Sequence, residues 1–366
     1  MSVPVLVVNP GSSSLKLHVL DSADEVIAAE DVSSTEGRAA GEDLERFLAG
    51  APPFGAAGIR FVHGGAGFRE SVLVDAEVLE GLAAVADLAP LHDPPALAAL
   101  ETLRRLRPDL PVVACFDTAF FACLPPAAAT YALPRTWIEE WGIRRFGFHG
   151  LSHAYASRRA AQLLGRPSTQ LRLVTCHLGA GASLAAVAGG APVDTTMGFT
   201  PLDGLVMATR CGSVDPGAVL WVLRHHRLSV DEVEQVLSRE SGLLGISGTS
   251  GDMRYVLGAA DRGDERAQLA VAVYVHRLRA GVAAMAAAMD GIDAVVFTGG
   301  VGENSIRVRE ETCAGLNFLG VTLDPARNAG TGDRDVTAEG SVARSLVVRA
   351  REDQEIAWEV RSHVGR

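Results

Sequence analysis

The sequence predicts an α/β protein with two lobes, and three observations lead to that fold class. At 366 residues the chain is too long for one average domain. Short apolar runs that end in glycine-rich turns alternate along it with stretches of helical periodicity. A strand–turn–strand pattern with a small-residue turn occurs twice, at residues 5–20 and 171–187, which indicates an internal duplication.

The first of these hairpins has an unusual turn. Apolar residues 5–8 run into Asn-Pro-Gly-Ser-Ser-Ser at 9–14, and a second strand follows at 15–20. The backbone N–H groups and hydroxyls of such a turn can bind a phosphate, whereas an ordinary polar hairpin turn is the alternative. Lys16 favours the phosphate site, because it is the only lysine among 33 Lys and Arg residues and its compact ammonium differs from a planar guanidinium.

Composition and charge exclude several classes of protein. The chain is 48% hydrophobic and 21% charged, with a formal net charge of −11, which argues against a general binder of nucleic acids or anionic membranes. Its five cysteines lack C-x-x-C spacing and predict a reduced, cytoplasmic protein without structural zinc. Because Arg277 and Arg279 interrupt the apolar stretch 270–289, we expect no membrane-spanning segment.

Two buried strands in the first third of the chain carry ionisable residues. The run 58–63 contains Arg60, whose charge must be paired or bound to an anion, and a paired core arginine is the alternative to an anion-binding one. The run 111–118 has Asp117 at its carboxyl end, where α/β sheets bind ligands. Helices are expected near 43–48, at 78–88 and at 95–106.

Two histidines and an arginine stand out in glycine-rich segments farther along. His149 and His153 precede a helix that runs to residue 164, and neither Cys nor Glu completes a metal-binding set there. We therefore expect His149 to bind substrate and His153 to have a structural role. The loop 194–216, with Arg210 among small residues, is long and rich in Gly and Thr, which is typical of a functional loop.

The C-terminal part contains a further glycine-rich turn. Residues 298–305 follow a strand at 293–297 and begin a helix, an arrangement that binds anions and nucleotides. The other elements predicted here are helices at 216–226, 230–238 with Ser229 as N-cap, 264–289 and 354–363, a loop at 241–254 and a strand at 345–348.

Eight motifs together resemble the acetate kinase family in their order along the chain and in their residues. They are NPGSSSLK, RFVHGG, FDTAF, RRFGFHGLSH, HLGAGAS, DTTMGFTPLDGLVMATRCGSVDP, SGDMR and FTGGVGENS, whereas the P-loop and dinucleotide fingerprints do not occur. The resemblance extends from residue 5 to residue 356. It implies a duplicated ribonuclease-H-like fold of the actin, Hsp70 and sugar-kinase type, with two lobes around a nucleotide cleft. It also implies a homodimer that transfers a phosphoryl group reversibly between ATP and acetate, giving ADP and acetyl phosphate, with Mg²⁺ or Mn²⁺.

The resemblance further implies roles for individual residues. The catalytic residues would be Lys16, Arg60, Asp117, His149 and Arg210. The residues that bind acetate would be Arg60, Val62, Leu91, Phe148 and Pro201. The residues that bind the nucleotide would be Lys16, His177, Leu178, Gly179, Ala180, Gly181, Asp252, Met253, Arg254, Gly300, Val301, Gly302, Glu303 and Asn304. Asn9 and Glu352 would lie at the magnesium ion.

The sequence departs from the family pattern in three of its motifs. Ala180 and Asp93 each stand where the family usually has Asn, and Ala-Arg-Glu-Asp at 350–353 replaces Thr-(Asn/Asp)-Glu-Glu around Glu352. The first change removes a side-chain donor from a phosphate-binding turn. The second adds a negative charge near the acyl pocket.

The implied reaction agrees with the chemistry of these residues. Phosphoryl transfer requires positioning and neutralisation of charge, which Arg, Lys, Mg²⁺ and backbone N–H groups supply. Because acetate is already ionised at neutral pH, we expect Asp117 to orient other groups or to bind the metal through water rather than to remove a proton.

Two alternative functions are open. One alternative is the same reaction on propionate or another short acid. The other is a non-catalytic ATP-binding regulator. The joint presence of four predicted catalytic residues argues against it, namely Arg60, Asp117, His149 and Arg210.

The predicted N-terminal lobe comprises 1–118 with 354–366 and carries the first phosphate hairpin. The C-terminal lobe, 119–353, is predicted to bind the nucleotide and to dimerise.

Overall fold

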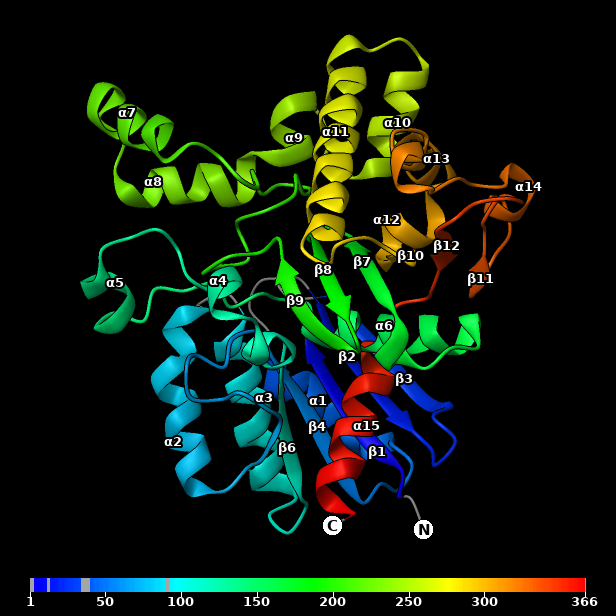
Figure 1. Cartoon of the computed structure of the whole chain (residues 1–366). Coiled ribbons are helices and arrows are strands. Elements are labelled where there is room, and N and C mark those ends of the chain that lie inside the picture. The colour runs from blue at the N-terminus through cyan, green and yellow to red at the C-terminus, as the bar shows by residue number, and fades with distance from the viewer. Residues whose placement is uncertain (1–2, 12–13, 34–39, 90–91, 366) are drawn as a thin grey trace. The chain divides into compact units, whose positions relative to one another are not determined.

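The computed structural model describes residues 3–11, 14–33, 40–89 and 92–365 (Figure 1). Leu91 of the predicted acyl pocket and Ser12 and Ser13 of the first turn lie outside the described residues. The chain divides into two compact units. Unit 1 comprises Met1–Ala122, Phe148–Tyr155 and Arg351–Arg366, and unit 2 comprises Cys123–Gly147 and Ala156–Ala350.

Unit 1 is built on a six-stranded sheet with the strand order β3-β2-β1-β4-β6-β5. β1 and β2 form the predicted hairpin, and β3 extends it as an antiparallel meander. β4 lies parallel to β1, β6 lies parallel to β4, and β5 is antiparallel to β6. The strands are β1 (Val5–Pro10), β2 (Ser14–Leu20), β3 (Val26–Ser33), β4 (Ala56–Phe61), β5 (Val72–Leu73) and β6 (Val112–Phe116).

Unit 2 repeats this arrangement in the order β9-β8-β7-β10-β12-β11. β7, β8 and β9 form the antiparallel meander, β10 and β12 follow in parallel, and β11 is antiparallel to β12. The matching topologies confirm the predicted duplication, because the two glycine-turn hairpins occupy equivalent positions. The strands are β7 (Arg172–Leu178), β8 (Ala182–Ala188), β9 (Ala191–Thr195), β10 (Ala294–Thr298), β11 (Arg334–Asp335) and β12 (Arg344–Val347).

Both faces of the unit 1 sheet are buried, which explains why β1 reads as a continuous apolar run rather than an alternating one. Leu6 and Val8 contribute to a core with Leu44, Leu82 and Leu100 of the helices on one face. Val5 and Val7 contribute to a second core with Ile356 and Val360 of the C-terminal helix. The helices of unit 1 are α1 (Ala40–Gly50), α2 (Ala76–Val85), η1 (Ala86–Leu88), α3 (Asp93–Leu106), η2 (Ala119–Cys123, at the boundary with unit 2) and α15 (Glu352–Val364), together with the start of α6 (Gly150–Leu164).

Gly58 lets α15 pack directly on β4. A Cβ atom at this position would lie 2.4 Å from Cγ2 of Ile356 and 2.7 Å from Cγ2 of Val360. Because such distances are far below van der Waals contact, only glycine permits this packing. The close approach holds the start of α15, which carries the predicted site residue Glu352, against the sheet.

Most predicted elements of unit 2 are present, but the predicted loop 241–254 is wrong. It contains α9 (Gly242–Ser247), and α10 (Met253–Asp261) begins before its end. Its glycines and serines have low helix propensity, so α9 depends on tertiary contact, and Leu243 and Ser247 of this helix are buried. The other helices here are α4 (Pro126–Ala129), α5 (Arg135–Glu139), η3 (Ser168–Gln170), α7 (Pro216–His226), α8 (Val230–Gln235), η4 (Val236–Glu240), α11 (Glu265–Ala287), α12 (Gly299–Asn304), α13 (Ile306–Ala314), η5 (Asn317–Leu319) and α14 (Pro325–Asn328).

α11 is the longest helix of unit 2. In the described part of the chain it alone is long and apolar enough to cross a membrane by length and composition, which the sequence analysis did not predict. In the structure it packs against α9, α10 and β8, and 44% of its most apolar window is buried. α11 is thus packed against other elements of unit 2 along part of its surface.

Candidate functional site

Four predicted site residues meet in unit 1. Asn9, Arg60 and Asp117 lie at the carboxyl ends of the parallel strands β1, β4 and β6, and Glu352 begins α15. Nε and Nη2 of Arg60 donate to the two carboxylate oxygens of Asp117 at 3.0 and 2.6 Å. Nη1 of Arg60 donates to Oδ1 of Asn9 at 3.1 Å, and the amide of Asn9 donates to Oε2 of Glu352 at 2.9 Å. The carboxyl edge of this sheet is thus lined by a connected polar network.

The Arg60–Asp117 pair is buried and bidentate. The side chain of Arg60 is 12% exposed and that of Asp117 is 1% exposed. Burial acts to lower the pKa of Arg60, but the negative charges of Asp117 and Glu352 outweigh it and raise this pKa above its ordinary value. The guanidinium therefore stays charged at any physiological pH, and Asp117 holds its plane in a fixed orientation.

The segment that carries His149 approaches Asp117 closely. The backbone N–H of Gly150 donates to the carbonyl of Asp117 at 3.0 Å, and a Cβ atom at Gly150 would lie 2.1 Å from that oxygen. His149 itself has φ +57°, a left-handed conformation that is uncommon for residues other than glycine. Such conformations gather at functional sites, where the surrounding structure maintains them.

His153 and two predicted acyl-pocket residues of unit 1, Val62 and Phe148, are buried. His153 is fully buried and contacts the ring of Phe121 edge-on at 5.8 Å between centroids, which supports its predicted structural role. Phe148 is 1% exposed and packs edge-on against His63 at 5.3 Å, and Val62 is 5% exposed. Val62 and Phe148 therefore present little surface to water, and their role in binding the acetate methyl group stays a prediction.

Asp93 is, with Asp117, a second buried carboxylate of this region. Its oxygens accept from the backbone N–H groups of Val62 at 2.8 Å and His63 at 3.3 Å, which fixes the turn that follows β4. Burial raises the pKa of Asp93 to about 7 from its ordinary value near 3.8. The folded protein thus binds this proton more tightly than the unfolded chain does.

This difference predicts the direction of a pH effect on stability. Because the pKa is higher in the folded state, the free energy of unfolding should fall as pH rises from about 4 through about 7. We expect Asp93→Asn to remove this part of the pH dependence and to be more stable than the parent at pH 8. Thermal unfolding between pH 4.5 and 8, with Asp109→Asn as an exposed control, measures the effect. Parallel Tm curves for the parent and Asp93→Asn would contradict it.

In unit 2 the turn between β7 and β8 carries the predicted phosphate-binding residues His177 to Gly181. The N–H of Gly179 donates to the carbonyl of Gly181 at 2.8 Å, which closes the turn. The carbonyl of Ala180 accepts from the N–H of Ala208 at 3.0 Å. The turn is therefore anchored through its backbone to the loop 194–216, and Ala180 itself is exposed.

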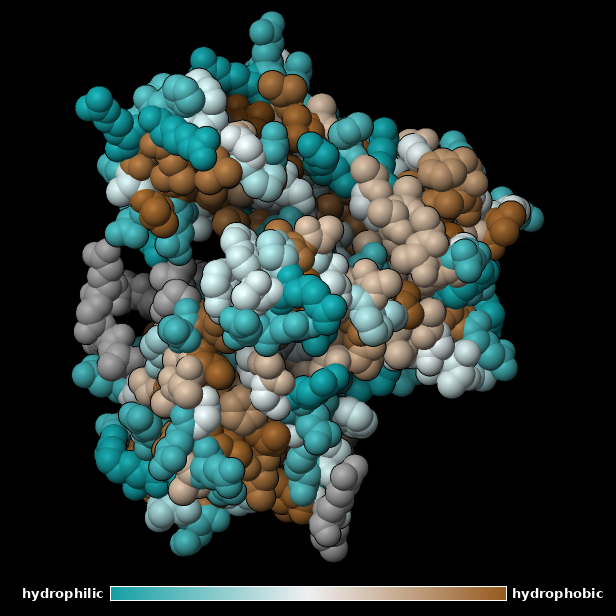
Figure 2. Space-filling model, turned by 60° about the vertical axis from the view of Figure 1, so that its left-hand side comes forward, coloured by the Kyte–Doolittle hydropathy of each residue, from teal (hydrophilic) through white to brown (hydrophobic). Residues whose placement is uncertain are grey.

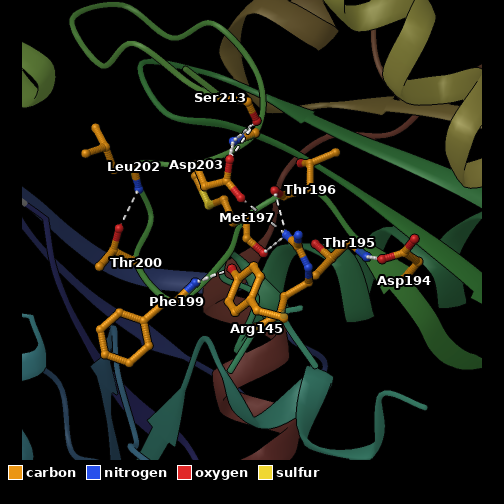
Figure 3. Close-up of polar contacts among 12 residues, drawn as sticks. Arg145, Asp194, Thr195, Thr196, Met197, Phe199, Thr200, Leu202, Asp203 and Ser213 are labelled. Atoms are coloured by element: carbon orange, nitrogen blue, oxygen red, sulfur yellow. Dashed lines mark hydrogen bonds and ion pairs between the residues drawn. The ribbon is translucent and has the colours of Figure 1, made fainter. Parts of the chain in front are cut away.

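Arg145 organises that loop, as Figure 3 shows. Its Nη1 donates to the carbonyls of Thr196 and Met197 at 3.0 and 2.9 Å and lies 3.5 Å from a carboxylate oxygen of Asp203. Asp203 in turn accepts from the hydroxyl of Ser213 at 2.6 Å. One guanidinium thus holds both arms of the loop together. The sequence did not predict this role, because in the pair Arg144-Arg145 nothing indicates which side chain points inward.

Arg210 and Pro201 are brought together in the same loop. Nη1 of Arg210 donates to the carbonyl of Pro201 at 2.7 Å, so the predicted phosphoryl-binding arginine lies next to a predicted acetate-binding residue. Asp252 caps α10 and binds the guanidinium of Arg254, whose side chain is 88% exposed.

The turn after β10 begins α12, which contains the predicted nucleotide residues Gly300 to Asn304. Gly299 has φ +77°, and a Cβ there would lie 2.8 Å from the carbonyl of Leu178. At the other end of α12, the buried Arg309 donates to the carbonyls of Gly302 and Glu303, both at 2.8 Å. Arg309 is a second residue that the sequence analysis missed. The signal available was its spacing, because it shares a helix face with the buried Thr312 and Cys313 at i+3 and i+4.

The remaining predicted residues are those expected to bind phosphate or the magnesium ion. Lys16 is an exposed residue of β2 that faces Asn9 in the strand register. Asn9 and Glu352 provide oxygen atoms of the kind that Mg²⁺ prefers. Among the described residues there is no group of three or more His, Cys, Asp or Glu side chains that could hold a metal. This donor set fits an ion that takes one or two protein oxygens and completes its shell with water and substrate phosphates.

Comparison with known sequences gives matches over most of the chain. A family model described as the Acetokinase family matches residues 52–358. The chain is 51% identical over 308 residues to an acetate kinase of a Synechococcus strain, covering 84% of this chain and 76% of that protein. It is 39% identical over 389 residues to an acetate kinase of Acetivibrio thermocellus, covering 97% of this chain and 98% of that protein.

Solved structures give matches over nearly the whole chain. The acetate kinase of Porphyromonas gingivalis superposes with a TM-score of 0.91 at 34% identity, covering 99% of both chains. A propionate kinase of Francisella tularensis superposes with a TM-score of 0.92 at 35% identity, covering 99% of this chain and 100% of that one. Their α/β fold is therefore also the fold of this chain.

Proposed function

This chain belongs to the acetokinase family, and we propose that it transfers a phosphoryl group reversibly between ATP and acetate in a Mg²⁺-dependent reaction. It is accordingly a phosphotransferase with a carboxyl group as acceptor. In the forward direction a carboxylate oxygen of acetate forms a bond to the γ-phosphorus, and the bond from that phosphorus to the β–γ bridging oxygen breaks. ADP leaves with the bond electrons, acetyl phosphate forms, and no proton is transferred.

The observation that carries this proposal is the Arg60–Asp117 pair at the carboxyl edge of the unit 1 sheet. A guanidinium held at a fixed angle can neutralise the equatorial oxygens of the transferring group, which is the main demand of this chemistry. Asp117 acts as the positioning partner of Arg60, and its use in this pair leaves it poorly suited to remove a proton. His149 and Lys16 would bind further oxygen atoms of the same group.

In unit 2 we assign Arg210 to the phosphoryl group and Pro201 to the methyl group of acetate. The turn 177–181, residues 252–254 and α12 would bind the nucleotide, since their backbone N–H groups and helix N-terminus suit phosphate. Asn9 and Glu352 would hold Mg²⁺, which neutralises phosphate charge when bound.

A direct test uses the purified chain with acetyl phosphate, ADP and MgCl₂, with ATP formation followed by a coupled assay. We expect ATP to form and the signal to disappear when either substrate is omitted or when EDTA removes the metal. The variant Arg135→Ala, which loses an exposed ion pair with Glu139, should match the parent enzyme. Binding of ATP without any phosphoryl transfer would instead support the non-catalytic regulator.

Propionate is the alternative acceptor, because a propionate kinase superposes on this chain as well as an acetate kinase does. The apolar residues Val62, Phe148 and Pro201 should favour a methyl group, yet one added methylene changes binding in such a pocket by only about 1–3 kcal/mol. We expect kcat/KM to be highest for acetate, moderately lower for propionate and poor for butyrate, whose length would displace packed side chains. Steady-state rates at one ATP concentration decide this, and butyrate equal to acetate would contradict the assignment of the pocket.

Lys16 offers a test of the first phosphate hairpin. We expect Lys16→Arg to lower kcat severely although it keeps the charge, because a bulky planar fork cannot replace a point charge beside a narrow turn. Steady-state kinetics with ATP and with acetyl phosphate measure the change. A kcat and KM close to those of the parent would show that the lysine is an ordinary surface residue.

We further propose that the protein is a cytoplasmic homodimer. Large apolar side chains remain exposed on α7, α8 and η4, namely Leu220, Trp221, Val230 and Val236 at 50%, 53%, 70% and 39%. Figure 2 shows hydrophobic patches on one face of the molecule between hydrophilic residues. Exposed apolar groups of this size are typical of surfaces that associate with another protein.

A further inference from the structure

Unit 2 contains a pocket of about 560 Å³ on the α14 side of α12. Its wall includes Arg309 of α13, Arg334 of β11 and Arg349 after β12, together with the Gly-Thr-Gly segment 330–332. Glu303 is the acidic residue among those that line it. Its volume falls in the range of pockets that bind small metabolites.

Two of the three arginines are brought together by one oxygen atom. The carbonyl of Asn328 accepts from Nη2 of Arg309 at 2.8 Å and from Nη2 of Arg334 at 3.1 Å. The two positive charges therefore lie close to each other, and both burial and the charge of Arg334 lower the pKa of Arg309, to about 10. Holding like charges side by side costs free energy unless a negative charge offsets it.

The described residues supply little such charge. Besides Asn328, Arg309 donates to the carbonyls of Gly302 and Glu303, and Arg334 donates to the carbonyls of Arg327 and Gly332. Neither of them forms an ion pair with a carboxylate in the part of the chain that the structure describes.

The nearby carboxylates make other contacts. Glu303 accepts from the N–H of Ala350 at 2.9 Å, and Glu310 accepts from the amide of Asn328 at 3.2 Å. Carbonyl oxygens satisfy hydrogen bonds but carry only partial charge, so the pocket keeps a net positive charge.

We propose that this pocket binds a small phosphate-bearing anion with two or more negative charges. Arg334 and the exposed Arg349 have N–H groups left for it, and guanidinium forks match phosphate oxygens in pairs. The backbone N–H groups of the 330–332 segment can add donors to such an anion. The pocket shares Glu303 and Asn304 with the residues proposed to bind the nucleotide, whereas Arg334 and Arg349 have no part in the proposed reaction.

The test is calorimetric titration of the purified full chain with pyrophosphate, without Mg²⁺, once in the absence of ADP and once with saturating ADP. We expect binding by the parent, and at least tenfold weaker binding by Arg334→Ala and by Arg349→Glu. Arg349 is exposed, so its variant should fold as the parent does, which circular dichroism checks. Arg262→Ala, an exposed arginine of the same unit, and Lys16→Ala should bind as the parent does.

Three results would overturn the proposal. One is that the parent does not bind pyrophosphate under these conditions. Another is that Arg349→Glu and Arg334→Ala bind it unchanged. The third is that ADP or Lys16→Ala abolishes binding, which would assign the anion to the nucleotide and phosphoryl residues instead.

Discussion

Replacing Arg60 by alanine is expected to lower kcat by two orders of magnitude or more, corresponding to a loss on the order of 3–5 kcal/mol of transition-state stabilisation. The structure adds a second effect. Because the side chain of Asp117 is 1% exposed and pairs with Arg60 through two hydrogen bonds, the variant leaves a buried carboxylate without its counter-charge. Breaking a buried pair in this way costs stability, so the Tm should fall as well.

A second variant separates the two effects. The double variant Arg60→Ala with Asp117→Asn removes the unpaired charge, so it should regain much of the lost Tm while kcat stays low. Thermal unfolding and steady-state kinetics on the parent, both variants and the control Arg135→Ala, whose ion pair with Glu139 is exposed on both sides, give the comparison. If activity returned together with stability, Arg60 would be a paired core arginine, which is the alternative that the sequence left open.

The sequence predicts well which residues lie in or at the end of a buried strand, because the local hydrophobic pattern locates the strands. Asp117 was expected at the carboxyl end of a buried strand, and it follows β6 directly. Arg60 was recognised as a charge in an apolar run that needs a partner. Which residue that partner is depends on β4 lying beside β6, a pairing between strands about fifty residues apart that no local pattern encodes.

The roles of Arg145 and Arg309 and the helix α9 could not be predicted from the sequence, because tertiary contacts decide all three. Arg145 binds the backbone carbonyls of Thr196 and Met197, which are far along the chain, and a carbonyl has no sequence signature. Arg309 binds carbonyls at the end of the preceding helix α12, and its spacing to the buried Thr312 and Cys313 was the one local signal. The helix α9 was missed because its glycines favour a loop locally, whereas burial of Leu243 decides the outcome. Ser229, by contrast, caps α8 as predicted, because a capping box needs only residues three apart.

Arg309→Ala is the second substitution for which we expect a large effect, because Arg309 is fully buried and all of its hydrogen-bond acceptors are neutral. Nε donates to Oδ1 of Asn328 at 2.6 Å, and the other bonds hold the carbonyls at the end of α12. Arg309→Ala would leave these buried oxygens without donors and open a cavity. Each unsatisfied group costs about 1–3 kcal/mol, so we expect a total loss of roughly 3 kcal/mol or more in the free energy of unfolding.

Because α12 contains the residues proposed to bind the nucleotide, a less ordered α12 should also raise the KM for ATP more than it lowers kcat. Arg309→Lys keeps the charge but cannot reach Asn328, Gly302 and Glu303 at once, so it should recover only part of either property. Arg307→Ala, on the same helix with a 40% exposed side chain, is the matched control and should change the Tm little. Urea unfolding and ATP kinetics on these three variants are the measurements. An Arg309→Ala protein with the stability of Arg307→Ala would show that the carbonyls find other donors, and that the guanidinium does not fix α12.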